Sequence, residues 1–197
     1  MPAEAASKLK VADIAELRER IGLSPVAAAA AGEGREAEML DRLAAAGFFP
    51  EATRLLAHAL PKREAVWWAC MCARHTAASG ADPASEAAVR ESAEEWVRRQ
   101  TDAFRRAAMA RAQAAGFSSP ESWAAVAAFW SGDSMAPPEA PKVPPEPHLA
   151  GLAAAGAVAL AAVRGRAERR EERLRRFLDS ARDIAAGGPG HLDPEPP

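Results

Sequence analysis

The chain has 197 residues, a formal net charge of −2 and a pI near 6.1. This length is sufficient for one domain with a sizeable core, and the near-neutral charge argues against a dedicated nucleic-acid-binding protein. Alanine, the best helix former, supplies 52 residues, whereas tyrosine is absent and no stretch of strand length alternates apolar with polar residues. The sequence therefore predicts an all-α fold, a compact bundle of helical hairpins.

Residues 1–34 are predicted to form short helices at the periphery of the fold. Apolar residues recur at helical spacing over Val11–Ile21, and Ser24-Pro25 has the cap-and-proline pattern that begins a second, alanine-rich helix. Gly32-Glu33-Gly34 then interrupts the chain before a main helical domain at residues 35–186. The first residues lack a basic start followed by an apolar run, so no signal peptide is expected.

A Gly-Phe pair follows two of the alanine-rich helices, at Gly47-Phe48 and at Gly116-Phe117. Glycine at such a place adopts the left-handed conformation that closes a helix, and the apolar residue after it contacts the last turn. Pro50 and Pro120 follow in the first turn of the next helix, where proline is favoured. Each pair is therefore expected to join the two helices of a hairpin.

Pro61–His75 is predicted to form the central helix of the bundle. Its residues Ala65–Ala73 carry no charge and are apolar on every face, which is typical of a helix surrounded by neighbours. Trp67 and Trp68 are about 100° apart on a helix, so one is expected to fill the core while the other faces a second layer or a partner.

The polar residues form no recognisable catalytic or cofactor-binding pattern. Cys70 and Cys72 point to opposite sides of one helix, which prevents a disulfide between them and indicates reduced thiols in a cytoplasmic protein. Cys72 and His75 have the spacing of two metal ligands, but no second pair has zinc spacing, so a core thiol beside a helix-terminal imidazole is the favoured interpretation. We expect no enzyme activity, no cofactor and no metal.

Two further helices are expected after Asp82-Pro83, the second beginning near Thr101 or Asp102. Their helical spacing places a set of apolar residues inward, and another helix follows at Trp123–Trp130. The inward set is Val89, Ala93, Trp96, Val97, Phe104, Ala107, Ala108 and Ala112.

Pro137–Pro147 contains six prolines in eleven residues, a composition that favours an extended polyproline II conformation. The favoured interpretation is a stiff strap that lies over the protein's own aromatic side chains. The alternative is a ligand for a small proline-binding domain, because Pro138, Pro141 and Pro144 have the spacing that such domains recognise.

Leu149–Val163 is predicted to be a buried helix in which Gly151 and Gly156 allow a neighbouring helix to approach closely. This stretch is short and weakly hydrophobic for a membrane span. Arg164–Asp183 is expected to continue as a charged helix whose eight arginines and five acidic residues form a solvated face. Residues 187–197, which begin with Gly-Gly-Pro-Gly, are expected to be a disordered tail.

Two blocks of the sequence resemble a bacterial family of uncharacterised function. The first is Leu60-Pro-Lys-Arg-Glu-Ala-Val-Trp-Trp-Ala, and the second is Phe129-Trp-Ser-Gly-Asp-Ser-Met-Ala-Pro-Pro. Val143-Pro-Pro-Glu-Pro-His-Leu and the helix after it are also similar, so the resemblance covers about Leu60–Gly188. The family is associated with type VI secretion gene clusters, which implies a small helical accessory protein. It brings no catalytic residues that can be carried over.

The expected function is contact with another protein, a type VI secretion component or its cargo, and not with a membrane. Tryptophan and proline-rich segments are frequent in such contacts. The residues expected to bind the partner are Trp67, Trp68, Pro138, Pro141, Pro144, Arg169, Arg173 and Arg176. The alternative is a helical nucleic-acid-linked regulator that places Arg164–Arg176 on phosphate groups, and an enzyme would need a pocket that collects distant polar residues.

Overall fold

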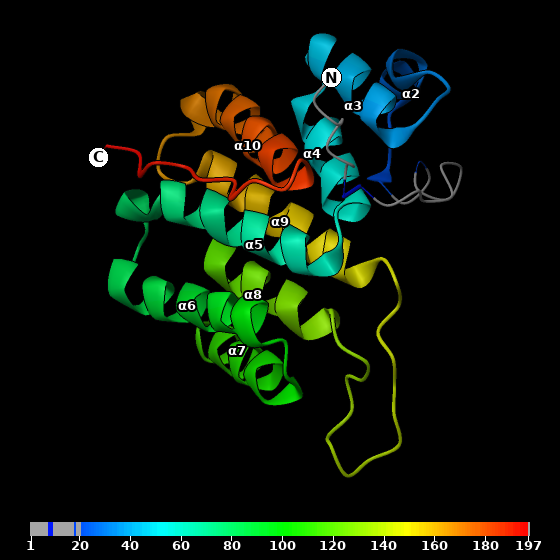
Figure 1. The fold of residues 1–197 in the computed structure, drawn as a ribbon. Coiled ribbons are helices and arrows are strands. Elements are labelled where there is room, and N and C mark those ends of the chain that lie inside the picture. Colours follow the sequence, from blue (N-terminus) through cyan, green and yellow to red (C-terminus); the bar gives the residue numbers. More distant parts are fainter. Residues whose placement is uncertain (1–7, 10–17, 19–20, 197) are drawn as a thin grey trace.

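The structure, a computed structural model, describes residues 8–9, 18 and 21–196. Within this part of the chain it contains nine α-helices, two short 3-10 helices and no strand, which confirms the predicted all-α class (Figure 1). The α-helices are α2 (Pro25–Ala31), α3 (Glu36–Ala45), α4 (Phe49–Ala59), α5 (Lys62–His75), α6 (Pro83–Arg99), α7 (Asp102–Ala114), α8 (Pro120–Trp130), α9 (Leu149–Val163) and α10 (Arg170–Ala185). The helix predicted at Val11–Ile21 lies outside the described residues, apart from Arg18 and Ile21.

Helix α5 occupies the centre of the bundle, as predicted. It packs against α6, α8, α9 and α10, and Figure 1 shows it between α10 on one side and α6 on the other. Acidic Glu64 lies in its first turn and Arg74 in its last, where each charge is favourable to the helix dipole. Every residue of Ala65–Ala73 is buried except Trp67, which is partly buried. Because this stretch carries no charge, neighbouring helices can enclose it without burying an ion.

The two Gly-Phe turns have the predicted backbone. Gly47 and Gly116 both have positive φ, and the amides of Phe48 and Phe117 donate to the carbonyl oxygens of Leu43 and Ala112. The side chains differ, because Phe48 packs against the core whereas Phe117 is 39% exposed. The predicted apolar contact is therefore wrong in the second turn, where Phe117 itself has a φ of 55°.

The inner face of α7 differs from the predicted one at two positions. Ala107 is exposed, and its neighbour Arg105 is buried in place of an apolar side chain. The guanidinium of Arg105 donates to the carbonyl oxygens of Phe129 and Ser134, over 2.8 and 2.7 Å. It also lies over the Phe129 ring, with Cζ 4.6 Å from the ring centroid. The carboxylate of Asp102, in the first turn of α7, accepts from Nε of Arg105 over 2.9 Å and balances the charge. These partners together compensate the burial of a charge that helical periodicity alone assigns to solvent.

Close packing of α9 against α4 depends on Gly151. A Cβ atom built on Gly151 would lie 2.5 Å from Nδ1 of His58 and 3.0 Å from the backbone oxygen of Ala57. At Gly156 the nearest atom is 3.8 Å away, on Trp123, which is an ordinary van der Waals distance. Of the two predicted close approaches, only the one at Gly151 is present.

Alanine substitutions at these two glycines are expected to have opposite effects. Gly151→Ala should lower the free energy of unfolding by about 1–3 kcal/mol, because the backbone of α4 would have to move. Gly156→Ala should raise it by about 0.5–1 kcal/mol, because alanine favours the helix and has room there. Urea denaturation followed by circular dichroism measures both, and equal effects would contradict the packing described.

Helices α9 and α10 are separate, although a continuous charged helix was expected after α9. Their axes differ by 119°, and the short 3-10 helix Ala167–Arg169 lies between them. Gly165 has a φ of +66°, and a Cβ there would lie 2.8 Å from Ser79. The side chain of Arg164 is bound to Glu121 of α8, with Nη1 2.9 Å from Oε1. The chain turns here because glycine permits the backbone angle and Arg164 is held on α8.

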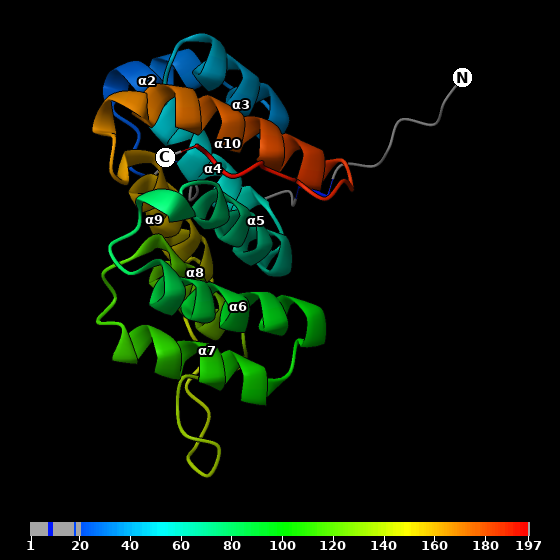
Figure 2. The same ribbon diagram turned by 90° about the vertical axis from the view of Figure 1, so that its left-hand side faces the viewer.

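Residues 187–196, called the tail below, are ordered along α5 and α10, so the predicted disorder is wrong for them. Figures 1 and 2 show this segment running beside both helices. The amide of Glu195 donates to the carbonyl oxygen of His75 over 2.7 Å, and the hydroxyl of Ser180 donates to that of Gly190 over 2.6 Å. The tail is ordered because these contacts satisfy its backbone, although its composition predicts no regular structure.

Candidate interaction sites

The two adjacent tryptophans of α5 lie in different environments. Trp68 is fully buried, and its Nε1 donates to the carbonyl oxygen of Phe177 in α10 over 2.8 Å. Trp67 lies at the surface, and its Nε1 donates to the carbonyl oxygen of Pro189 in the tail over 2.7 Å. One tryptophan therefore fills the core and the other faces a second layer, as expected. Trp68 is inaccessible to a partner that docks on this structure.

The predicted solvated arginine face is wrong at Arg173. Its side chain is 0% exposed, and its Nε lies 3.1 Å from Oε2 of Glu195 in the tail. Nη1 donates to the carbonyl oxygens of Ala162 and Arg164 over 3.1 and 2.6 Å, which caps the end of α9. Helical periodicity misses this role because the carboxylate lies 22 residues further along the chain, in a segment without a helical pattern.

The other two candidate arginines of this region are placed differently. Arg169 is partly buried, and its Nη1 lies 3.0 Å from Oε1 of Glu195. Arg176 is half exposed and pairs with Glu172, 2.7 Å away and one turn earlier on α10. The structure therefore brings Arg169 and Arg173 together around one carboxylate, whereas Arg176 remains on the solvated face.

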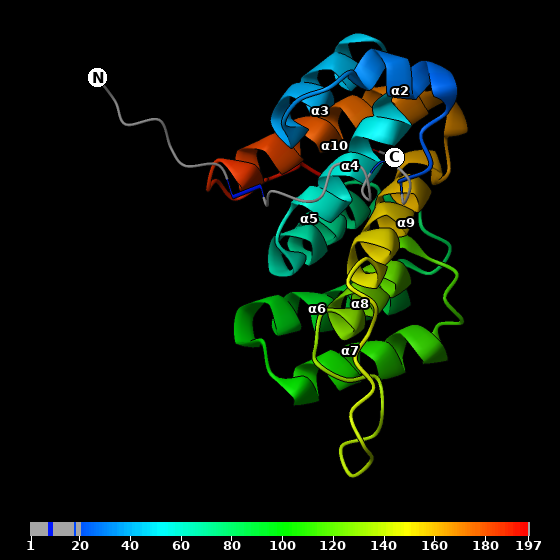
Figure 3. The same cartoon turned by 90° about the vertical axis from the view of Figure 1, so that its right-hand side faces the viewer.

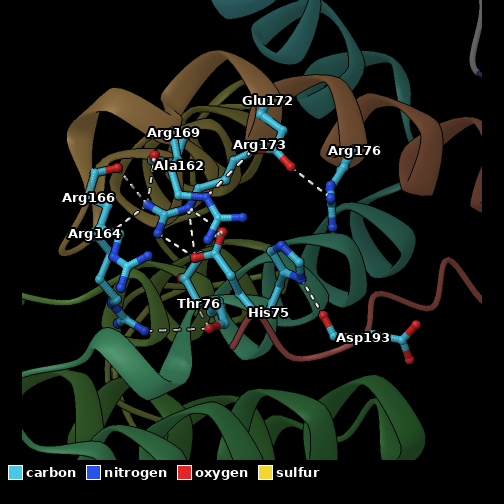
Figure 4. Close-up of polar contacts among 12 residues, drawn as sticks. His75, Thr76, Ala162, Arg164, Arg166, Arg169, Glu172, Arg173, Arg176 and Asp193 are labelled. Carbon is cyan, nitrogen blue, oxygen red and sulfur yellow. Dashed lines mark hydrogen bonds and ion pairs between the residues drawn. The ribbon is translucent and has the colours of Figure 1, made fainter. Parts of the chain in front are cut away.

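His75 lies beside this cluster and is 2% exposed. Its Nδ1 donates to the carbonyl oxygen of Asp193, and its ring packs edge-on against Phe177, with 5.8 Å between ring centroids. The imidazole is thus held by the tail, which is a contact that the Cys72–His75 spacing did not predict (Figure 4).

The two cysteines are buried free thiols. Burial raises the pKa of both, helped by the charge of Glu94 at Cys70 and by Cys70 at Cys72. Both thiols are therefore protonated at neutral pH, which makes them poor nucleophiles and poor metal ligands. Among the described residues, no three His, Cys, Asp or Glu side chains are close enough to share a metal ion.

Docking of the tail is expected to weaken in acid. Burial by itself raises the pKa of the Glu195 carboxyl, but the hydrogen bond and charge of Arg173, with Arg169 and His75, outweigh it and hold the pKa below its ordinary value. A pKa that is lower in the docked state means that this stabilisation is complete above the ordinary value of about 4.3. It is lost as the pH falls through the docked-state pKa.

The NMR signal of the Trp67 indole N–H, which reports its bond to Pro189, should show this acid transition. The transition should be absent in a Glu195→Gln chain, whose side chain does not titrate in this range. An identical pH dependence in the two chains would show that another group controls docking.

Residues 131–148 form a loop between α8 and α9, called the proline loop below, which projects away from the helices (Figures 1, 2 and 3). Pro138, Pro141 and Pro144 are exposed, whereas Pro145 is buried. The predicted strap over the protein's own aromatic side chains is therefore wrong for these three prolines.

The proline loop also folds back on itself, contrary to the expected continuous extended conformation. The amide of Ala140 donates to the carbonyl oxygen of Pro137 over 3.1 Å, and that of Met135 to Val143 over 2.7 Å. Pro138 occupies the second position of this turn, where proline is favoured because its φ is already correct. Of the three prolines with the recognised spacing, only Pro141 and Pro144 lie together, in the part of the loop that follows the turn.

One face of α9 is an exposed apolar stripe that sequence reasoning missed. Leu152, Leu160 and Val163 are 49%, 36% and 40% exposed, and Gly156 and Ala159 lie between them on the same face. The opposite face consists of small buried residues, chiefly alanine, because close helix packing requires them. The sequence carried no signal of this exposure, because larger apolar residues gathered on one side of a helix normally indicate its buried face.

The stripe borders a hollow of about 320 Å³ between α4, α9 and α10. Its lining includes Pro50, Leu152, Gly156 and Leu174, and the cations Arg54 and Arg170 lie at it. Figure 3 shows α9 on the face of the molecule turned to the viewer. No single helix within the described ranges is long and apolar enough to cross a membrane.

A family model described as a family of unknown function, DUF6931, matches residues 39–185. The chain belongs to the DUF6931 family. Comparison with curated proteins and with solved structures found no match. The DUF6931 region begins within α3 and ends with α10, so it contains α5, the proline loop and the α9 stripe. The tail lies beyond it, although the residues that hold the tail lie within it.

Proposed function

We propose that this DUF6931 protein is a non-catalytic accessory protein that binds another protein through the exposed stripe of α9. The stripe comprises Leu152, Gly156, Ala159, Leu160 and Val163, and it is the observation that carries the proposal. Apolar side chains that gather on one surface are typical of protein interfaces, whereas single exposed ones are ordinary.

The chemistry of the stripe favours a helix as the bound element. Its central residues, Gly156 and Ala159, are small, and the flanking Leu152 and Leu160 are large, so a partner helix can lie between them. The hollow beside Gly156 can accept a large apolar side chain, with Arg54 and Arg170 at its rim for acidic groups. The proline loop, with exposed Pro141 and Pro144, is a second contact within the same proposal.

The finer proposal is that the partner is a component or cargo of a bacterial type VI secretion system. Its support is the resemblance of the Leu60–Ala69 and Phe129–Pro138 blocks to a family linked with such gene clusters. The proposal places the protein in the cytoplasm, where two free buried thiols are stable.

Affinity purification from the native host tests both levels of the proposal. The baits are the wild-type chain, a Leu152→Lys/Leu160→Lys variant and a Pro141→Ala/Pro144→Ala variant. Val26→Glu is the matched control, because Val26 is an exposed apolar residue in the first turn of α2, a helix that packs against α3. We expect a secretion component to be retained by wild type and control, and its recovery to fall about tenfold or more with the α9 variant.

Equal recovery with the control and the α9 variant would remove the α9 stripe from the proposal. Failure to retain any secretion component, together with normal secretion in a deletion strain, would remove the type VI assignment. The regulator alternative has less support, because Arg173 is buried and Arg164, Arg169 and Arg176 are all paired with carboxylates. Salt-dependent DNA binding would restore it.

A further inference from the structure

The tail is held in the way that a receptor holds an extended peptide. Its backbone oxygens accept from Trp67, His75 and Ser180, and the Glu195 amide donates to the backbone of His75. The tail has no helix or strand of its own. These four contacts recognise main-chain atoms, and the one at Gly190 also requires a glycine, because a Cβ there would lie 2.4 Å from Ile184.

One charged side chain of the tail is recognised specifically. The Glu195 carboxylate is 4% exposed and receives Arg173 and Arg169 together. Arg173 needs an anion, because it is fully buried and its charge is otherwise met only by carbonyl oxygens. By contrast, His191 and Asp193 have side chains that are 63% and 94% exposed. Gly190 has a φ of +63°, a Cβ there would lie 2.4 Å from Ile184, and Leu192 packs against the core. The recognised pattern is therefore Gly190, Leu192 and one carboxylate, and the prolines on both sides of Glu195 favour an extended backbone there.

The receptor and its occupant belong to different parts of the chain. Trp67, His75, Arg169, Arg173 and Ser180 lie within the DUF6931 region, whereas the tail follows it after Gly187. The receptor surface also extends past the tail. A hollow of about 270 Å³ lies beside Trp67 and Gly188, lined by Lys8, Arg63 and Arg98 among others. Glu64 also lines this hollow and pairs with Lys8 and Arg63, so a segment longer than the tail would meet both signs of charge there.

We propose that this surface of α5 and α10 is a binding site for an extended acidic segment of a partner protein, with the tail as its occupant in cis. The partner segment carries a glutamate flanked by prolines, and its carboxylate replaces that of Glu195 on Arg173 and Arg169. The site is distinct from the α9 stripe, so either can fail without the other.

A labelled peptide with the sequence of residues 187–196 tests the site on the full-length chain. In the wild-type chain the linked tail competes at an effective concentration in the range of about millimolar. In a Glu195→Gln chain this competitor is weakened, and the peptide should bind about tenfold more tightly, measured by fluorescence anisotropy. A peptide with glutamine in place of glutamate should bind with an affinity lower by about the same factor.

A second peptide tests whether the site accepts other segments with this pattern or only the tail of this chain. It keeps the three glycines, Leu192 and Pro194-Glu195-Pro196, and replaces Pro189, His191 and Asp193 with serine. Binding within about tenfold of the native peptide supports recognition by backbone and carboxylate. Loss of binding overturns the proposal, since only this chain's own tail would then fit. Equal binding of glutamate and glutamine peptides overturns it as well.

Two controls keep the outcome decisive. If the Glu195→Gln chain fails to fold, a protease site inserted between Gly187 and Gly188 lets the tail be cut in an otherwise wild-type chain. The labelled peptide should then exchange with the cut tail, and no exchange would contradict the proposal. Sedimentation of the intact chain over a range of concentrations detects tail exchange between copies, which would assign the site to a second copy instead.

Discussion

Replacing Arg173 with alanine is expected to lower the free energy of unfolding by about 3–5 kcal/mol. The substitution leaves Glu195 with a buried charge that only Arg169 still contacts. It also removes the donor from the carbonyl oxygens of Ala162 and Arg164 at the end of α9. Both effects act in the same direction, because each removes a hydrogen-bond partner from a buried polar group.

Arg176→Ala is the matched control for this prediction. Arg176 lies one turn from Arg173 on α10 and is half exposed, and its pair with Glu172 is one of the exposed i, i+4 pairs. Such pairs contribute about 0.3–0.5 kcal/mol, so this variant should unfold almost as the wild type does. Urea denaturation of both variants is the measurement. Similar losses would show that Arg173 is not the buried centre described.

A double-variant cycle locates the source of the effect. Arg173→Ala combined with Glu195→Gln should cost less than the sum of the two single changes, because the second removes the charge that the first leaves unpaired. Additive losses would mean that the two side chains act independently. In that case the carbonyl contacts at the end of α9 would account for the cost of Arg173→Ala.

Trp68→Ala is expected to be comparably damaging, at about 3–5 kcal/mol. Trp68 is fully buried on the central helix, so alanine leaves a cavity between α5 and α10 and deprives the Phe177 carbonyl oxygen of its indole donor. Trp67→Ala should cost far less, about 1 kcal/mol, because Trp67 is only partly buried and its hydrogen bond is a single neutral one.

The two variants also differ in what else they change. Trp67→Ala should loosen the tail, seen as faster hydrogen exchange at the Glu195 amide, without unfolding the bundle. Trp68→Ala should lower the midpoint of the whole cooperative transition. Equal destabilisation by the two variants would contradict their placement in the core and at the surface.

The sequence alone was sufficient to predict most of the helices of this protein. Alanine content and 3.6-residue periodicity predicted the helices, Asp82 and Thr101 cap them as expected, and Gly47 and Gly116 close them. The charge-free run Ala65–Ala73 correctly indicated the central helix. These features are predictable because each depends on residues within about one helical turn of one another.

The candidate sites required contacts between distant residues. Periodicity placed Arg173 in solvent, because the carboxylate that buries it lies on the tail. Composition predicted a disordered tail. It could not indicate that the backbone of the tail bonds to His75 of α5 and Ser180 of α10, which lie outside the tail. The sequence of α10 alone does not predict the Arg173–Glu195 ion pair, and the sequence of the tail alone does not predict that the tail is ordered.

What the sequence determined by itself is therefore which segments are helical, which residues cap several of them, and which helix lies at the centre. Only the tertiary structure decided that α9 and α10 meet at a sharp turn, that α9 keeps an apolar face exposed, and that the tail is bound. The physical reason is that burial of a charge or exposure of a leucine depends on which distant surface lies opposite. The periodicity of apolar residues along one helix depends only on residues of that helix.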